Sequence, residues 1–285
     1  MPESINSADI EKLIAKLREP KMIKKLTDLA SIFELSPDYD MAKKFIDTAK
    51  KDLIASKTLY LNGDYSNSTF HLQQAIEKIA KAYALQIGFL SIKEIKGVGH
   101  ETPEVFLRLL KRKKFVRPLI DLVNQISPTT IDINKLNEIN RISKKLRDKK
   151  TKVEVAKYSK EQIENILKLC KNIKESFIKM KELFIIIIPS IQSKVKQNLL
   201  NELKSFVPKI KPENVDEIIK TLKPEFFDFI ANFLIMFVLA IITYPHASFT
   251  RYPNGTIKSE DYAPGLGIVD MMPQLHNMVE DIINK

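Results

Sequence analysis

The chain has 285 residues, 44% of them hydrophobic, which is enough to bury a substantial core in one large domain or two small ones. Its formal net charge of +11 at pH 7 favours polyanionic partners such as nucleic acid, nucleotides or an acidic protein, although Lys- and Glu-rich helices are also common in thermophilic proteins. The single cysteine, Cys170, excludes a disulfide framework and a cysteine metal site.

The composition favours helices over sheet. The sequence has only 7 glycines and 14 prolines, no tryptophan, and many Lys, Ile, Leu and Glu residues. Alternating runs with glycine-rich hairpin turns do not occur in it. We therefore predict an all-α fold. Residues 1–7 are polar and do not resemble a signal peptide, so we expect a cytoplasmic protein.

Two short helices are expected before the main pattern begins. Ser7 can cap a helix over residues 8–18, and residues 21–33 form a second. A turn and helix-start signal follows at residues 36–38. From there, apolar residues at helical spacing predict a helix of about twenty residues, over 40–61.

A Gly63-Asp64 turn leads into the most informative stretch of the chain. Asp64, Ser66 and Ser68 are candidate N-caps for a helix that runs through at least Leu85. Its apolar residues predict one buried stripe: Leu72, Ala75, Ile76, Ile79, Ala82 and Tyr83. Its polar residues share a second face, which spacing alone would make a solvated surface: His71, Gln74, Lys78 and Lys81, with Gln73 and Glu77 beside them.

The next segments are a loop and further helices. Residues 88–99 are expected to form a loop, and helices are expected from residue 102 or 103 to 113 and over 116–126. Between residues 159 and 188, apolar residues at alternating steps of three and four predict a long helix that ends at Pro189. Its partner is the 131–146 segment, the 191–206 segment or the same helix of another subunit. Cys170 lies in that apolar seam and is expected to be a core residue.

A dense group of cations precedes this long helix. Such a group can contact a phosphate backbone, or it can be a solvated loop and helix end. As a candidate nucleic-acid-binding patch it comprises Lys144, Lys145, Arg147, Lys149, Lys150 and Lys152.

The C-terminal part is expected to supply the most hydrophobic helix. A short helix over 214–222 precedes residues 226–244, which are almost long enough to span a membrane. Asp228 and Asn232 interrupt the stretch, so we expect a core helix and no stable membrane insertion. A loop over 245–264 and a closing helix over 271–283 follow.

Three motifs, in this order, resemble the HEPN (higher eukaryotes and prokaryotes nucleotide-binding) domain family. The segment GDYSNSTFHLQQAIEKIAKA, residues 63–82, resembles the second helix of that family. Gly99-His100 looks like the entry to its third helix. Thr250-Arg251-Tyr252-Pro253, with Tyr262, looks like the Arg-Tyr-Pro loop before its last helix. Asp52 falls where the family often carries a polar residue.

The resemblance implies an up-and-down helical bundle with a helical addition and an insertion. On this interpretation residues 1–37 are an N-terminal helical extension, residues 38–128 supply HEPN-like helices 1–3, residues 129–223 form a long, basic, coiled-coil-like insertion, and residues 224–285 complete the bundle. The resemblance also implies a homodimer and association with a minimal nucleotidyltransferase, as in toxin–antitoxin pairs.

The family's catalytic motif is missing. Many HEPN proteins are metal-independent ribonucleases with Arg-x4–6-His, in which His acts as general acid or base and Arg stabilises the phosphorane. Here only the reversed order occurs, His246 and then Arg251, and the sequence has no P-loop, dinucleotide fingerprint or zinc-helix motif. We therefore expect no cofactor, no metal site and a non-catalytic protein that binds a nucleotide or RNA.

Candidate ligand-binding residues come from the second helix and the two loops: His71, Gln74, Lys78, Lys81, His100, His246, Arg251 and Tyr252. Two alternatives stay open. One is a ribonuclease toxin with an unconventional Arg/His set, in which His71, His100, His246 and Arg251 converge. The other is a structural interaction protein whose charge only keeps it soluble.

Overall fold

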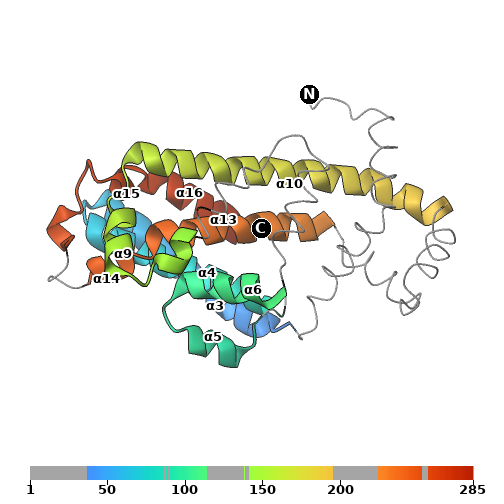
Figure 1. Ribbon diagram of the computed structural model, residues 1–285, viewed down its shortest axis with the longest axis horizontal. Helices are drawn as coiled ribbons and strands as arrows, with labels where there is room; N and C mark the ends of the chain where they lie inside the picture. Colours follow the sequence, from blue (N-terminus) through green and yellow to red (C-terminus); the bar gives the residue numbers. More distant parts are fainter. Residues whose placement is uncertain are drawn as a thin grey trace. The chain divides into compact units, whose positions relative to one another are not determined.

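The computed structural model describes residues 37–86, 88, 90–113, 138, 141–194, 224–251 and 256–284. Every regular element among these residues is helical, which confirms the all-α fold (Figure 1). The predicted helices over 8–18, 21–33, 116–126 and 214–222 lie outside the described residues, as do most of the 131–146 and 191–206 segments.

The chain divides into two compact units. The large unit comprises Phe33–Arg112, Asp132–Lys171 and Asn232–Lys285. The small unit comprises Met1–Ile32, Lys113–Ile131 and Asn172–Ala231.

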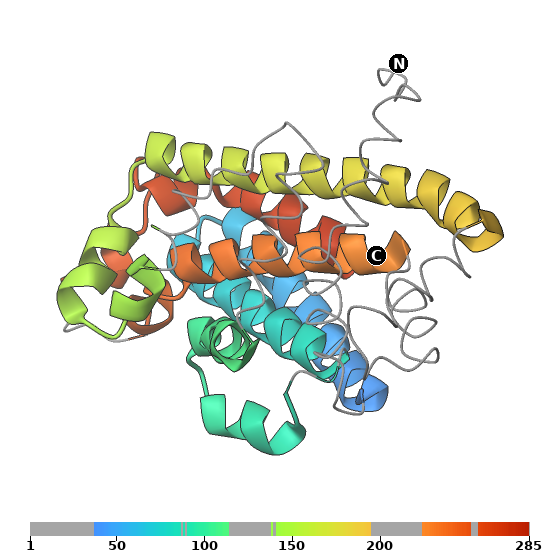
Figure 2. The ribbon, with the colours of Figure 1, turned by 45° about the vertical axis from the view of Figure 1, so that its right-hand side comes forward.

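A pair of antiparallel helices forms the centre of the large unit (Figure 2). Helix α3, Tyr39–Leu61, is capped by Asp38, whose carboxylate accepts a hydrogen bond from the Met41 N–H at 2.9 Å. Helix α4, Tyr65–Gln86, begins after Asp64, whose carboxylate accepts from the Asn67 N–H at 3.2 Å. The predicted helices over 40–61 and 64–85 are therefore present, and the predicted cap of the second is used.

Helix α4 is buried on more than its apolar stripe. All six residues of the predicted stripe are buried, and so are Gln73, Gln74, Glu77 and Lys81 on the polar side. Around α4 pack α3 and three C-terminal helices: α14, His246–Phe249; α15, Gly267–Asp270; and α16, Met272–Ile283. A 3-10 turn, η1, lies at Ser259–Asp261. Because other elements cover both sides of α4, its polar residues must satisfy one another inside the protein.

The predicted loop over 88–99 is wrong in part, because it contains a helix. Helix α5 spans Ile92–Val98 and has a capping box at its start. Ser91 accepts from the Glu94 N–H, while the Glu94 carboxylate accepts from the Ser91 N–H at 2.9 Å. Two buried side chains, Ile95 and Val98, hold the helix on the unit. Helix α6, Thr102–Lys113, follows as predicted.

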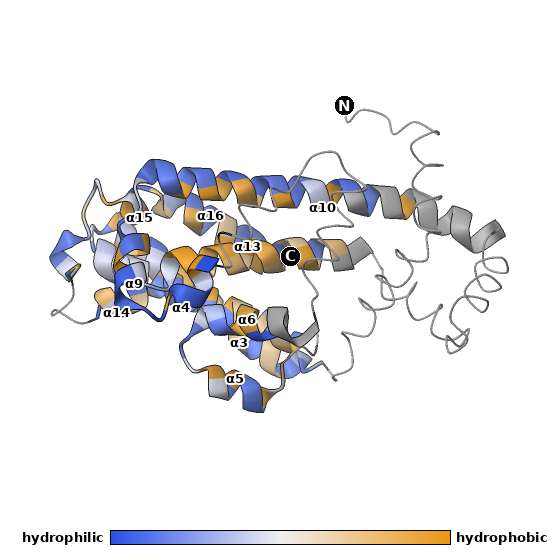
Figure 3. Ribbon diagram, in the orientation of Figure 1, coloured by the Kyte–Doolittle hydropathy of each residue, from blue (hydrophilic) through white to orange (hydrophobic). Residues whose placement is uncertain are grey.

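The most hydrophobic helix, α13, spans Pro224–Thr243 (Figure 3). Within the large unit its residues 232–243 are all buried. The Asn232 amide donates to the Tyr83 hydroxyl at 3.2 Å, so the polar residue in this helix has an internal partner. The Phe106 ring lies 4.9 Å from Phe233 and 5.2 Å from Phe237, centroid to centroid. Among the described helices, none combines the length and the hydrophobicity that a membrane span requires.

Helices α9 and α10 carry the basic segment. Helix α9 spans Lys149–Ala156 and α10 spans Lys160–Lys194. Between them the backbone passes so close to Gly267 that a Cβ there would lie 2.1 Å from the Tyr158 carbonyl oxygen. Only glycine permits this approach.

The apolar seam predicted in the long helix contains Ile163, Cys170, Ile173 and Phe177, which are all buried. The end predicted at Pro189 is wrong, because α10 continues to Lys194. The fixed φ of proline is compatible with helical backbone geometry, so a proline does not by itself end a helix.

The described part of the small unit consists of residue 113, residues 172–194 of α10 and residues 224–231 of α13. Phe177 and Phe227 are buried there, and Lys181 forms an ion pair with Asp228. Asp228, the charge that interrupts the hydrophobic stretch, therefore has a partner.

Candidate functional site

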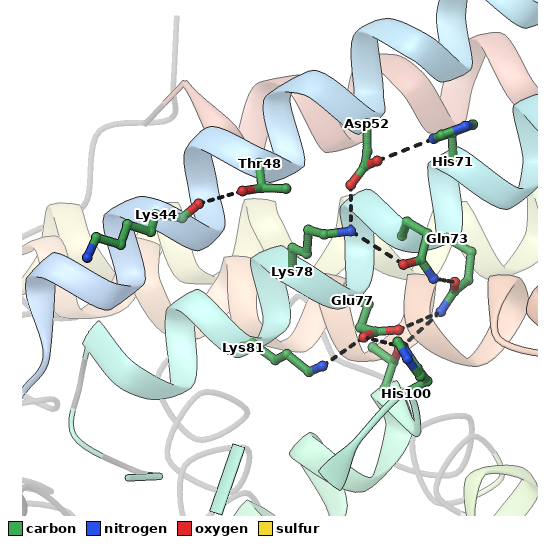
Figure 4. Close-up of polar contacts among 11 residues, drawn as sticks. Lys44, Thr48, Asp52, His71, Gln73, Glu77, Lys78, Lys81 and His100 are labelled. Carbon is green, nitrogen blue, oxygen red and sulfur yellow. Dashed lines mark hydrogen bonds and ion pairs between the residues drawn. The ribbon is translucent and has the colours of Figure 1, made fainter. Parts of the chain in front are cut away.

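The polar face of α4 forms a connected network of side chains with α3 and with the loop before α6 (Figure 4). At one end, the Asp52 carboxylate of α3 lies against two residues of α4. Its Oδ2 lies 2.6 Å from the Lys78 ammonium, and its Oδ1 lies 3.3 Å from His71 Nδ1. The Asp52 side chain is 17% exposed and that of Lys78 is 20% exposed, so this ion pair is largely shielded from water.

Glu77 is the centre of the other end. Its Oε1 lies 2.7 Å from the Lys81 ammonium and 3.1 Å from His100 Nδ1. Its Oε2 accepts from the Gln73 amide at 3.4 Å. The Glu77 side chain is only 4% exposed, whereas that of His100 is 74% exposed. A buried carboxylate thus holds an exposed imidazole by one nitrogen.

Gln74 connects the two ends. Its amide donates to the Gln73 side-chain oxygen at 2.7 Å, and its own oxygen accepts from Lys78 at 3.4 Å. Gln73 also donates to the Thr102 hydroxyl at 3.2 Å, which attaches α4 to the start of α6. Of the predicted residues on this face, Gln74, Lys78 and Lys81 are therefore engaged within the fold.

The backbone at Gly99 places His100 over Glu77. Gly99 has a φ of +60°, a region that favours glycine, and its carbonyl accepts from Lys81 at 2.6 Å. Lys81 therefore bonds both to the carboxylate and to the peptide next to His100. Any other residue at position 99 would strain the turn that positions the imidazole.

The predicted basic patch lies beside His100. Arg147 Nη2 donates to Glu101 Oε2 at 2.8 Å and lies 3.6 Å from Glu104 Oε2. Glu101 follows His100 directly in the sequence, so Arg147 bonds to the residue next to His100. Lys152 of the patch is half-buried. The other lysines of the patch are exposed: Lys144, Lys145, Lys149 and Lys150.

Tyr244, which directly follows α13, contacts the patch. The Lys152 ammonium lies 4.9 Å from the centre of its ring. Burial raises the pKa of the Tyr244 phenol; Glu101 and Glu77 act in the same direction and Arg147 opposes them.

The C-terminal candidates do not converge with His100. His246 is 1% exposed, and its Nδ1 lies 2.7 Å from the Tyr262 hydroxyl. Burial lowers the pKa of His246 to about 3, so the ring is a neutral core group. Arg251 is exposed, and its guanidinium lies 4.3 Å from the centre of the Phe70 ring, next to His71. Tyr252 lies outside the described residues.

His276 is a second interior histidine. Its Nε2 lies 2.7 Å from Ser56 Oγ, which itself donates to the Ser68 carbonyl at 2.7 Å. This group joins α16 to α3 and α4. Burial lowers the pKa of His276 to about 4; Lys57 lowers it further and Glu280 opposes the shift.

Across the part of the chain that the structure describes, no three His, Cys, Asp or Glu side chains form a group that can hold a metal ion.

The fold and the site define an all-α bundle in which the central helix pair carries a buried polar network. Residues 42–181 match the family model described as the HEPN domain. The chain therefore carries a HEPN domain, which confirms the resemblance seen in its motifs. The matched residues run from α3 into α10 and include part of the segment assigned to an insertion; the division of the chain at 37, 128 and 223 stays a prediction. No curated protein and no solved structure matched the chain.

Sequence reasoning gave no role to several residues of this site, among them Asp52, Phe70, Glu77 and Tyr244. Glu77 carried a signal, because it lies four residues before Lys81, the spacing of a helical ion pair. Asp52 carried one too, since a charge in the middle of a packed helix needs a partner. Phe70 and Tyr244 carried no local signal, because their cation partners are distant in sequence.

Proposed function

We propose that the protein binds RNA at the surface where the basic patch meets His100. The observation that carries the proposal is the pairing of Arg147 with Glu101 and Glu104, which holds the cations of the patch beside the exposed imidazole. A HEPN domain supports a nucleotide- or RNA-related function, and the net charge of +11 suits a polyanion.

The chemistry of this surface suits a single strand of RNA. Exposed lysines neutralise phosphates and release counterions, so their contribution falls as salt rises. Arg147 presents a planar guanidinium that can bind a phosphate through two N–H groups. Tyr244 is half-buried behind these cations, and part of its ring can face a base.

The rest of the function follows from the family. We propose that the protein is a homodimer that works with a minimal nucleotidyltransferase, as in toxin–antitoxin pairs, in the cytoplasm. Size measurement in solution tests the dimer: a mass near the 32.8 kDa of one chain would contradict it.

The RNA-binding test compares two variants that lose the same charge. The patch variant changes Lys144, Lys145, Lys149 and Lys150 to Gln, and the control variant changes the exposed lysines of α3, Lys43, Lys44, Lys50 and Lys51, to Gln. Binding of labelled single-stranded RNA is measured against salt concentration.

We expect the patch variant to bind RNA at least about tenfold more weakly than the wild type. The slope of log binding constant against log salt concentration should fall by about 3, since each of the four lost phosphate contacts removes about 0.7. The control is expected to keep most of the slope. If both variants lost the same amount of RNA affinity, the effect would come from net charge alone, and this would contradict the proposed site.

A further inference from the structure

Arg147 is held by two carboxylates at the start of α6. Its Nε and Nη2 both donate to Oε2 of Glu101, at 3.2 Å and 2.8 Å. Its Nη2 also lies 3.6 Å from Oε2 of Glu104. These contacts occupy the edge of the guanidinium that carries Nε and Nη2, and arginine binds a phosphate through two parallel N–H groups of just this kind.

The two carboxylates differ in how firmly they are held. Glu104 has a second partner, because its Oε1 accepts from Nε of Arg108 at 3.3 Å, and its side chain is only 15% exposed. The side chain of Glu101 is 44% exposed and that of Arg147 is 71% exposed. Water reaches both partners of the Arg147–Glu101 pair, so this pair can open without leaving a buried charge behind.

The backbone of Glu101 is fixed on both sides. Its N–H donates to the Val98 carbonyl at 3.2 Å, and its carbonyl accepts from the Glu104 N–H at 2.8 Å. These bonds attach residue 101 to the end of α5 and to the start of α6. A change of side-chain rotamer is therefore enough to withdraw the carboxylate from Arg147.

A carboxylate and a phosphate compete for the same donors of an arginine. Both are anions, and both accept N–H groups in the plane of the guanidinium. Asp148, the neighbour of Arg147 in the sequence, does not take part in this competition, because its carboxylate caps α9 and accepts from the Thr151 N–H at 2.9 Å. Glu101 is thus the exposed carboxylate at the donors that a phosphate needs.

We infer that Glu101 is an internal competitor of RNA: its carboxylate occupies two N–H groups of Arg147, and a phosphate of the strand takes its place when RNA binds. This inference rests on the proposed RNA binding and adds the residue that regulates it.

The competitor also defines the class of ligand. It lowers the affinity of every anion that needs these two donors. A strand offsets this loss, because its neighbouring phosphates reach the exposed lysines of the patch at the same time. A nucleoside monophosphate has no such neighbours. The surface therefore takes a strand and excludes the single nucleotide.

The experiment measures binding of labelled single-stranded RNA by the full chain at one low salt concentration. The test variant is Glu101→Gln. The matched control is Glu154→Gln, which removes the same charge from an exposed residue of α9, the helix that begins within the patch. Arg147→Gln and the double variant Arg147→Gln with Glu101→Gln complete a double-mutant cycle. Because both carboxylates are exposed, both single variants should fold like the wild type.

We expect Glu101→Gln to bind RNA about fivefold more tightly than the wild type, because an exposed ion pair no longer has to open. Glu154→Gln should change the affinity by less than about twofold, since a screened charge outside the contact acts weakly. With Arg147→Gln already present, Glu101→Gln should gain no more affinity than Glu154→Gln does.

Three results would overturn the competition at Arg147. Equal RNA affinities of Glu101→Gln and Glu154→Gln would attribute the gain to net charge. Weaker binding by Glu101→Gln than by the wild type would make Glu101 a residue that positions Arg147 for the ligand. An undiminished gain beside Arg147→Gln would separate the effect of Glu101 from Arg147. In all three cases the wild type still binds RNA and the proposed function stands, whereas absence of RNA binding by the wild type and by Glu101→Gln would reject both.

The ligand class is tested by displacement of the labelled strand from the wild type. We expect an unlabelled strand to displace it and a nucleoside monophosphate at the same concentration of phosphate to leave it bound. Equal displacement by the two competitors would reject the preference for a strand.

Discussion

The four histidines of this chain divide into two pairs with opposite surroundings. His246 and His276 lie in the interior, 1% and 4% exposed, and their ring nitrogens contact the hydroxyl groups of Tyr262 and Ser56. His71, on α4, and His100, in the loop before α6, are reached by water and pair with carboxylates. The interior pair joins helices, whereas the surface pair keeps one nitrogen available to a ligand.

The two pairs of histidines differ in the group that each imidazole contacts. A hydroxyl can pair with a neutral imidazole, so burial favours the uncharged ring and lowers its pKa. A carboxylate fixes the tautomer of a ring that water still reaches. Candidate histidines are therefore best assigned from what they contact.

The largest expected effect is acid destabilisation through the interior pair. Burial lowers the pKa of His246 to about 3 and of His276 to about 4, from 6.5. As the pH falls, these two histidines take up protons at a higher pH in the unfolded chain than in the folded one. Their contribution to the free energy of unfolding is therefore fully present above about pH 6.5. Below that pH it decreases toward the folded pKa values, by up to about 1.4 kcal/mol per pH unit for each ring. Denaturant unfolding at about pH 7.5 and about pH 5 measures the loss.

Glutamine variants isolate the contribution of the interior pair, because carboxylates also titrate in this range. Between about pH 7.5 and about pH 5, the free energy of unfolding of the double variant His246→Gln with His276→Gln should fall by several kcal/mol less than that of the wild type. The same pH dependence in the wild type and in this double variant would contradict the assignment of the acid destabilisation to the interior pair.

The next effect concerns the ion pair beneath His100. Lys81 is 8% exposed, and Lys81→Met would leave the Glu77 carboxylate buried with only Gln73 and His100. We expect a loss of about 3 kcal/mol or more, because a buried charge loses its partner. Urea unfolding measures it. The double variant with Glu77→Gln should recover part of the loss; a double variant less stable than the sum of the singles would refute the pairing.

A smaller loss is expected from the hydroxyl that holds His276. Ser56→Ala removes the bond to His276 Nε2 and the bond to the Ser68 carbonyl, each at 2.7 Å. Leaving these buried groups unpaired should lower stability by about 1–3 kcal/mol. The control is Thr48→Ala, which removes an exposed hydroxyl bond to the Lys44 carbonyl at 2.8 Å. An equal decrease of the thermal unfolding temperature in Ser56→Ala and Thr48→Ala would contradict the prediction.

The smallest effect is expected at the surface histidine itself. His100→Ala removes a contact between a buried carboxylate and an exposed ring, and Glu77 keeps Lys81. We expect less than about 1 kcal/mol in urea unfolding, as for exposed ion pairs. A larger loss would make His100 a structural residue like His276.

The helices of the centre could be predicted from the sequence because their signals are local. Asp38 and Asp64 cap α3 and α4, and the stripe from Leu72 to Tyr83 gives the apolar spacing. The capping box of Ser91 and Glu94 was also local, but the seven-residue α5 is too short for apolar spacing to indicate it.

The site could be predicted only in part, because its contacts join distant residues. His100 bonds to Glu77 across 23 positions, and Arg147 bonds to Glu101 across 46. Spacing placed Gln74 and Lys81 on a polar face but did not show that other elements bury it. Helical periodicity gives the faces of one helix, and only packing decides which of them water reaches.

Cys170, in the buried apolar seam of α10, can report when this part of the protein opens. Cys170 is the sole thiol, it is fully buried, and burial raises its pKa to about 12. A thiol-specific reagent therefore reacts only when this part of the bundle opens, since the reactive thiolate needs both access and charge. The rate of labelling reads out native-state opening at position 170, with no engineered probe and no competing cysteine.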